Sequence, residues 1–333
     1  MQYHYRLYGM RVTTDLDFIQ LDPVRLRKKD GEEDFPEEVR IFAMNEEEEA
    51  QFHREHGDCV CGSFLDRKKS WLCNRTLEMS VERGRKIRYR IRKGGDPGAA
   101  RTYLLGFGMA ILTMQQGKLA IHCSALESPQ GEALLIAGES GAGKSTLTAA
   151  LLDRGYRFLA DDMAVAEISG ADGVWVYPAF PYMKLCRDVA LKQGYAPEEL
   201  LYIDEKKDKF LVPCREVFQR EKVRLKHLVF LEMLSENEEP EGRPGEIKAE
   251  KITGPDSMLV YKENLFLHHL WKRQDPGMEI WQNCLKMAEQ IPVYSVKRPA
   301  AGDSTAEVAA EVHALQVPCQ LKNSSGSSEG CGG

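Results

Sequence analysis

The sequence contains no long apolar run. No segment reaches the roughly 20 apolar residues that a membrane-spanning helix requires. The first residues, MQYHYRLYGMRVTTDL, also lack the basic start and continuous apolar stretch of a signal peptide. The nine cysteines are an odd number and lack the spacing of a disulfide-bonded exported domain. We therefore expect reduced thiols, a cytoplasmic location and no membrane partner.

An excess of positive charge is also missing. The chain has 45 Lys and Arg against 51 Asp and Glu, which gives a net charge of −6. This balance disfavours broad contact with a nucleic-acid backbone, although RGRKIRYRIRK (83–93) is a local basic stretch. Hydrophobic residues at 43% and charged residues at 29% are typical of a globular protein. We expect no nucleic-acid partner.

The 333 residues fit one large domain or two modest ones, at roughly 100–200 residues each. Apolar and polar residues alternate in segments 3–13, 38–44 and 77–91, which predicts short strands before the Gly- and Pro-rich breaker at 94–99. The pattern predicts a β-rich domain over 1–100 and a core over 101–316. Residues 317–333 form a Ser- and Gly-rich tail typical of a flexible segment.

The core shows the periodicity of an α/β protein. Apolar residues from Arg101 recur at helical spacing until Gly117, and one strand is predicted over 118–126, with His122 and Ser124 on the same face. Residues 132–138 read as a buried strand and 144–153 as the helix that follows it. Further strands are predicted at 157–160, 163–168, 173–177, 227–232 and within EQIPVYSVKRP (289–299), and helices near 256–271, 277–289 and 303–315.

A phosphate-binding loop joins that buried strand to its helix. Gly138, Gly143, Lys144 and Ser145 satisfy G-x-x-x-x-G-K-[ST]. Backbone N–H groups and the helix N-terminus favour an anion there, Lys144 would reach the outer phosphates and Ser145 would bind Mg²⁺. We expect ATP phosphates to contact the whole loop, which consists of Gly138, Glu139, Ser140, Gly141, Ala142, Gly143, Lys144, Ser145 and Thr146.

Two adjacent aspartates follow the next predicted strand. Asp161 and Asp162 end YRFLADD, and a carboxylate at a strand end beside the phosphate loop is the usual second handle for Mg²⁺. Strand geometry points neighbouring side chains in opposite directions, so one aspartate can bind metal while the other accepts a proton. A solvated Asp-Asp turn is the alternative.

The loop alone leaves the class of nucleotide-binding protein open. The chain has no N-K-x-D run for reading guanine and no L-S-G-G-Q run of a transporter ATPase. HCSAL (122–126), GESGAGKST (138–146) and RGYRFLADD (154–162), in this order and spacing, resemble the HPr kinase/phosphorylase family of P-loop serine kinases. That resemblance implies an HPr-kinase-like P-loop core and transfer of a phosphoryl group from ATP.

The resemblance also assigns roles to single residues. His122 is implied to lie near the transferred phosphoryl group, and Lys144 and Ser145 to hold triphosphate and metal. The pair Asp161 and Asp162 is implied to supply metal binding and the general base. Their roles stay exchangeable, with Asp162 preferred as base and Asp161 as metal ligand. Without the resemblance, the role of His122 stays open, because an interior strand histidine is more often merely hydrogen-bonded than catalytic.

Departures from the family pattern bear on the substrate. The E-[IV]-R-G-[LIVM]-G signature of bifunctional members is missing after the aspartates, so phosphorolysis and HPr itself are not expected. YRLYGMRVTTDLDF, PYMKLCRD and IPVYSVKRP resemble HPr-kinase-like proteins encoded with ribosomally made peptides, including lasso-peptide kinases. A serine-containing protein or precursor peptide is then the expected acceptor. Lys184 and Arg187 are candidates for substrate or phosphate contact, or ordinary solvated residues.

Three functions remain open from the sequence. The preferred one is an ATP- and Mg²⁺-dependent serine kinase. The others are a nucleotide-gated binding module and a kinase of a small hydroxyl metabolite, and the sequence leaves room for a homo-oligomer. His53, His56, Cys59 and Cys61 are zinc-binding residue types, but their spacing favours a surface loop over a metal site.

Overall fold

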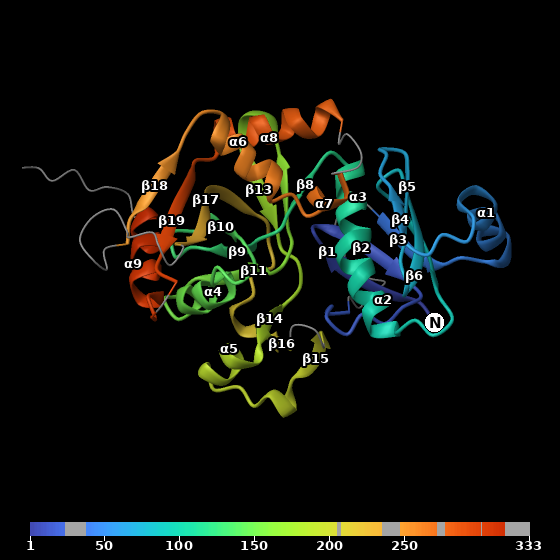
Figure 1. Cartoon of the computed structure of the whole chain (residues 1–333), viewed down its shortest axis with the longest axis horizontal. Coiled ribbons are helices and arrows are strands. Elements are labelled where there is room, and N and C mark those ends of the chain that lie inside the picture. Colours follow the sequence, from blue (N-terminus) through green and yellow to red (C-terminus); the bar gives the residue numbers. More distant parts are fainter. Residues whose placement is uncertain (24–37, 205–207, 235–246, 272–276, 301, 317–333) are drawn as a thin grey trace, which may run out of the picture.

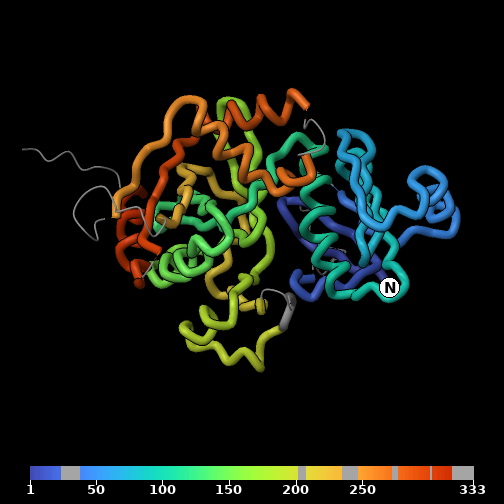
Figure 2. The backbone as a smooth tube through the Cα atoms, in the orientation of Figure 1, coloured from blue at the N-terminus to red at the C-terminus, as the bar shows by residue number. Residues whose placement is uncertain are grey.

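A computed structural model describes residues 1–23, 38–204, 208–234, 247–271, 277–300 and 302–316. The predicted tail, 317–333, lies outside these residues. Figure 2 shows the chain as two bodies side by side, the first made by the N-terminal residues and the second by the remainder. The predicted α/β class with a β-rich N-terminal unit is confirmed.

The N-terminal unit is a seven-stranded sheet in the order β1-β2-β3-β7-β6-β5-β4. Its alternating burial, clearest in Glu38–Ala43, follows the alternating sequence that predicted it. Helix α1 (Glu46–His56) begins with a capping box in which Asn45 and Glu48 bond each other's backbone N–H groups. The strands are β1 (Tyr3–Leu7), β2 (Met10–Thr14), β3 (Glu38–Ala43), β4 (Gly62–Phe64), β5 (Lys69–Cys73), β6 (Leu77–Glu82) and β7 (Lys86–Ile91).

The helix predicted from Arg101 packs on this sheet. It consists of α2 (Pro97–Tyr103), a π-helical turn (Leu104–Gly108) and α3 (Met109–Gln115), which run on from one another. A β-carbon at Gly108 would meet Ile87 and Met79 of the sheet at 3.3 and 3.4 Å. Gln115 donates to the carbonyls of Asp66 and Val81. The helix therefore belongs to the N-terminal body as much as to the core.

The core sheet contains nine strands of the described residues, in the order β11-β9-β10-β17-β13-β12-β8, with β19 on β17 and β18 on β19. Strands β10, β17 and β19 are parallel, so their carboxyl ends meet at one edge. The strands are β8 (Leu119–Ile121), β9 (Ser124–Glu127), β10 (Ala133–Gly138), β11 (Arg157–Ala160), β12 (Ala164–Ile168), β13 (Val174–Tyr177), β17 (Val223–Met233), β18 (Ala249–Ile252) and β19 (Val293–Arg298).

Two pairs of helices pack together in the core. Helix α4 (Lys144–Leu152) packs beside α9 (Thr305–Gln316), and α6 (Pro255–Glu263) packs beside α8 (Met278–Gln290). In Figure 1, α4 and α9 lie near the end of the core remote from the N-terminal sheet. No helix in the described ranges combines the length and apolarity needed to cross a bilayer.

Two predicted elements are interrupted. The single strand expected over 118–126 stops at Ile121 and restarts at Ser124, because β8 pairs with β12 whereas β9 pairs with β10 and β11. The helix expected over 256–271 divides into α6 and α7 (His268–Trp271), and Leu265 between them bridges to Ile121. In both places, contacts between distant segments interrupt the element that the local hydrophobic periodicity predicts.

A small third sheet had no counterpart in the sequence prediction. Strands β14 (Tyr182–Cys186), β15 (Leu201–Asp204) and β16 (Lys209–Pro213) are antiparallel, with α5 (Arg187–Lys192) after β14. This sheet protrudes from the core below α4 in Figure 1. Its first strand carries Lys184 back to the aspartate pair.

The two bodies share one apolar core. Buried residues from the N-terminal sheet, from α3 and from the core sheet form a continuous cluster. Tyr8, at the tip of the β1–β2 hairpin, is 1% exposed and donates its hydroxyl to the Met163 carbonyl at 3.4 Å. Its backbone N–H donates to the Pro178 carbonyl at 3.1 Å. The N-terminal unit is thereby fixed directly beside the residues that follow Asp161 and Asp162.

Candidate functional site

The glycine loop leaves β10 at the parallel edge and enters α4 at Lys144. Gly138 has φ of 141°, and a β-carbon there would lie 2.3 Å from the Leu231 carbonyl oxygen. Gly143 has φ of 100°, a region that L side chains rarely adopt. Glu139, Ser140 and Gly141 are exposed. The two glycines allow a tight turn, and the exposed residues between them can present backbone N–H groups to an anion.

Lys144 lies across the loop it belongs to. Its Nζ donates to the carbonyls of Gly138 at 2.7 Å and Glu139 at 3.0 Å. Partial burial lowers the pKa of the ammonium, and the negative charge of Asp161 opposes this shift. Asp162 also acts on Lys144 in the same direction as Asp161, so both aspartates influence the loop lysine.

Arg298 adds a second cation to the loop. Its Nε donates to the Ala142 carbonyl at 2.7 Å and its Nη2 to the Gly141 carbonyl at 3.3 Å. The sequence analysis did not identify this residue. A signal was present, however, because Arg298 ends a strand parallel to β10, and such ends reach the same edge as the phosphate loop.

Asp161 is held between two strands. Its Oδ1 accepts from the Ser124 hydroxyl and its Oδ2 from the Lys184 backbone N–H, both at 2.8 Å. Each carboxylate oxygen has a second lone pair that these bonds leave unused. The group can therefore take a cation without losing its protein partners.

Asp162 has different partners from its neighbour. Its Oδ2 accepts from Lys184 Nζ at 2.7 Å, and its side chain is 32% exposed. Burial would raise the pKa of this carboxyl, but the charge and hydrogen bond of Lys184, with His122 and Lys209, lower it to about 2. The backbone has φ of 68°, which is uncommon outside glycine and is found at functional sites. Asp162 is therefore an anion at neutral pH.

His122 lies at the break between β8 and β9 and faces the second aspartate. Its Nδ1 is 2.8 Å from the Asp162 carbonyl oxygen and 3.7 Å from Oδ1 of the same residue. A carbonyl oxygen only accepts, so Nδ1 carries the proton and Nε2 keeps a lone pair. Burial lowers the pKa of the imidazole, against the opposing charge of Asp162. The ring is thus neutral near pH 7.

The two basic candidates after the aspartates separate in space. Lys184 belongs to the site through Asp162, whereas Arg187 pairs with Asp208 at 2.7 Å and lies over the Phe210 ring. Lys209, which the sequence analysis did not single out, acts electrostatically on both Lys144 and Asp162. One lysine therefore contacts the aspartate pair, and two others, Lys144 and Lys209, interact with it electrostatically.

A cavity of about 360 Å³ continues from the loop along α4. Its walls include Gly143, Thr146, Ala150, Arg298 and Asp303. This position, beside the helix that follows the phosphate loop, has room for the ribose and base of a nucleotide whose phosphates lie on the loop. A nucleotide with its phosphates on the loop would therefore place its nucleoside in this cavity.

The residues also fit Mg²⁺. Magnesium is usually held by one or two carboxylates with substrate phosphate oxygens and water. Asp161, Asp162 and the partly exposed Ser145 supply that type of donor. Within the described ranges, no group of three His, Cys, Asp or Glu side chains is arranged to hold a metal by itself. Phosphate oxygens would have to complete the coordination.

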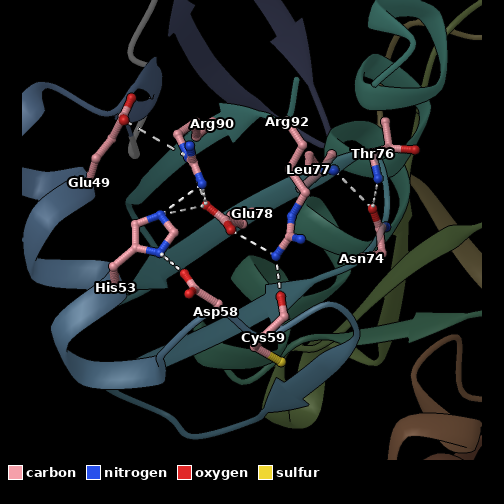
Figure 3. A network of polar contacts seen from close by, with 10 residues as sticks. All are labelled: Glu49, His53, Asp58, Cys59, Asn74, Thr76, Leu77, Glu78, Arg90 and Arg92. Atoms are coloured by element: carbon pink, nitrogen blue, oxygen red, sulfur yellow. Dashed lines mark hydrogen bonds and ion pairs between the residues drawn. The ribbon is translucent and has the colours of Figure 1, made fainter. Parts of the chain in front are cut away.

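The histidines of α1 have structural partners. His53 Nε2 lies 2.7 Å from Arg90 Nη2 and 3.5 Å from Glu78, and Glu78 also pairs with Arg90 and Arg92 (Figure 3). His56 stacks on Trp71 with ring centroids 4.5 Å apart. The basic stretch 83–93 is therefore partly neutralised by glutamates within the N-terminal sheet.

Comparison with known proteins gives little. No protein-family profile matches the sequence, and no curated protein matches it. Among solved structures, the chain is similar to the Hpr(Ser) kinase/phosphatase from Coxiella burnetii, at 13% identity over 59% of this chain and 95% of that one, with a TM-score of 0.32. A likeness at this level supports no functional inference.

Proposed function

We propose that this chain is an ATP- and Mg²⁺-dependent kinase that transfers the γ-phosphoryl group to a serine hydroxyl of a protein or peptide. The observation that carries the proposal is the electrostatic influence of the aspartate pair on the lysine of the phosphate loop. Lys144 on the phosphate loop and the pair Asp161–Asp162 interact electrostatically, and His122 bonds the backbone of the second aspartate. One carboxylate beside the loop is enough to bind Mg²⁺, and the second is free for proton transfer.

The loop and its lysine would bind the triphosphate. Backbone N–H groups between Gly138 and Lys144 would surround the phosphates, and Lys144 would exchange its two carbonyl partners for phosphate oxygens. Arg298 would keep the loop in shape through Gly141 and Ala142. Bound Mg²⁺, held by Ser145 and Asp161 with the phosphates, would neutralise charge that develops during transfer.

Asp162 is assigned as the group that accepts the acceptor's proton. It is anionic, it is more loosely engaged than Asp161, and it faces both Lys184 and His122. Its low pKa makes it a weak base, but transfer through a loose transition state needs alignment more than basicity. Neutral His122, through its free Nε2, would orient the acceptor or phosphate beside it.

The family and location are part of the proposal. The order HCSAL, GESGAGKST and RGYRFLADD supports an HPr-kinase-like serine kinase, and a peptide acceptor extends the resemblance to the lasso-peptide kinases. All seven cysteines in the described ranges are unpaired, which is compatible with the reducing cytoplasm where ATP is abundant. We expect neither nucleic acid nor membrane as a partner.

Transfer from γ-labelled ATP tests the proposal. The purified chain with Mg²⁺ is incubated with serine-containing peptides, and label on a peptide hydroxyl is measured. We expect transfer by the wild type and by Lys93→Ala, an exposed lysine remote from the loop, and loss of transfer in Lys144→Ala. Tight ATP binding without label on any acceptor would instead indicate a nucleotide-gated module. Label on free hydroxyl metabolites alone would indicate a small-molecule kinase.

A further inference from the structure

A second, narrower pocket borders the aspartate pair on the side of the N-terminal unit. It holds about 20 Å³, room for little more than one water-sized group. The β1–β2 hairpin and the segment after it, the start of the long helix, and the core all contribute walls. The wall residues used below are Tyr8, Gln20, Leu105, Asp162, Phe180 and Lys184.

Gln20 is the unexplained residue of this pocket. It is 7% exposed, and its Oε1 is buried without a hydrogen-bond partner. A buried amide oxygen that makes no hydrogen bond is costly, and native proteins leave few of them. Tyr8 differs, because its hydroxyl is already bonded to the Met163 carbonyl. The walls of the pocket thus include the unpartnered acceptor of Gln20 and the carboxylate of Asp162.

We propose that this pocket is the acceptor subsite, and that Gln20 binds the acceptor by accepting a hydrogen bond from an N–H next to the reacting hydroxymethyl group. The inference rests on the proposed kinase function and adds a substrate-binding residue from outside the core. A seryl unit has this chemistry, with a hydroxymethyl group and an N–H on the same carbon. A pocket of about 20 Å³, with Leu105 and Phe180 in its walls, would admit the hydroxyl end of a hydroxymethyl group and exclude a large side chain.

The transfer step assigns each bond in this arrangement. The seryl oxygen attacks the γ-phosphorus of ATP, and the bond from that phosphorus to the β,γ-bridging oxygen breaks. The hydroxyl proton passes to the Asp162 carboxylate, and ADP leaves with the bonding electron pair. Gln20 takes no part in this exchange. Its effect should appear in the KM for the acceptor and hardly in kcat.

The seryl unit can belong to a peptide or to free serine, and the test separates the two. The probes are a degenerate peptide library with one fixed serine, the same library with an ester oxygen in place of the serine N–H, free L-serine, and 3-hydroxypropionate, which has no N–H. Transfer from γ-labelled ATP is measured with wild-type protein, Gln20→Leu and Gln51→Leu. Gln51 is an exposed glutamine of α1 and serves as the matched control.

For whichever source accepts label, we expect Gln20→Leu to raise the acceptor KM about tenfold, with kcat and the KM for ATP within twofold. With wild-type protein, a probe that lacks the N–H should show the same rise in acceptor KM. Combining Gln20→Leu with the probe that lacks the N–H should raise the acceptor KM no more than either change alone. Gln51→Leu should behave as wild type. The ester and 3-hydroxypropionate arms need no protein variant, so they test the proposal even if Gln20→Leu folds poorly.

Independent, multiplying penalties would overturn the role of Gln20 while leaving the kinase function intact. So would full activity of wild-type protein on the probe that lacks the N–H, or a parallel rise in the KM for ATP. Absence of label on every probe, with ATP still bound, would overturn the kinase function and this inference with it.

Discussion

Two charged clusters in this molecule use similar side chains to different ends. In the N-terminal sheet, Glu78 is 1% exposed and is enclosed by Arg90, Arg92 and His53 (Figure 3). In the core, Asp162 is 32% exposed, has Lys184 as its ion-pair partner within 3 Å, and has a left-handed backbone. The first cluster is closed on itself. The second is open toward a phosphate loop and a pocket.

The difference shows what to look for in a candidate site. A carboxylate saturated by arginines stabilises a sheet, because the fork-shaped guanidinium uses its donors on it. A lysine uses fewer donors on each carboxylate and can also bond other groups. A carboxylate beside lysines therefore keeps lone pairs that can bind a ligand. Lys144 illustrates this, since its present partners are two carbonyls of its own loop. The charge of a cluster does not tell whether it binds a ligand or stabilises the fold. Hydrogen-bonding groups that are left unused do distinguish the two.

The largest effect should follow from removing the loop lysine. We expect Lys144→Ala to lower kcat/KM for transfer by about 10³-fold, roughly 4 kcal/mol of transition-state stabilisation. Stability should change little, because the ammonium is partly desolvated in the free protein. Steady-state transfer and thermal unfolding measured together check both parts. A loss of stability as large as the loss of activity would show that Lys144 has a structural role.

The reverse pattern should follow from the closed cluster. Glu78→Gln removes the charge that Arg90 and Arg92 share, and we expect a loss of about 3 kcal/mol in the free energy of unfolding. Transfer per folded molecule should stay within twofold of wild type. Urea unfolding and activity at a temperature below both transitions measure the two quantities. A large activity loss at unchanged stability would contradict the contrast between the clusters.

Acid should weaken the open cluster in a defined range. The carboxyl of Asp162 has its pKa lowered from an ordinary value of 3.8 to about 2. A lowered pKa stabilises the fold above pH 3.8, and that contribution is lost as pH falls through about 2. The stability difference between wild type and Asp162→Asn should be at most about 2 kcal/mol at pH 5 and should shrink toward pH 2.5. Asp172→Asn, at an exposed turn, is the matched control. A pH-independent difference would show that the ion pair with Lys184 does not set this pKa.

The smallest effect should come from the loop's outer support. Arg298→Ala removes two donors to loop carbonyls, and we expect ATP affinity to fall about fivefold, roughly 1 kcal/mol. Transfer from saturating ATP should be nearly unchanged. Titration of a fluorescent ATP analogue measures the affinity. A larger loss in kcat than in affinity would assign Arg298 to the transferred phosphate instead.

The parts that sequence could predict are local. The strand, glycine loop and helix from 133 to 152 are adjacent in the chain. Their hydrophobic periodicity and their glycines predict them locally, and the structure confirms the prediction closely. Contacts between distant segments set the rest. The strand over 118–126 breaks because its halves pair with different neighbours, and no residue within it signals this.

The same reason limits prediction of the site. Asp161 and Asp162 could be found because a strand end beside the loop is a recurring position. Lys209, Arg298 and Gln20 reach the site from other elements, and only the assembled sheets bring them there. Of these three, Arg298 was the one that the sequence could have indicated, because it is the last residue of a strand parallel to β10.

Single-turnover transfer by Asp162→Asn tests the central claim most directly. ATP is pre-bound, a serine peptide that wild-type protein labels is added, and label on the peptide is followed in one turnover. The account predicts ATP affinity within about twofold of wild type and a transfer rate lower by about 10³-fold. Transfer at the wild-type rate would contradict it, because the Asp162 carboxylate would then have no part in the chemistry.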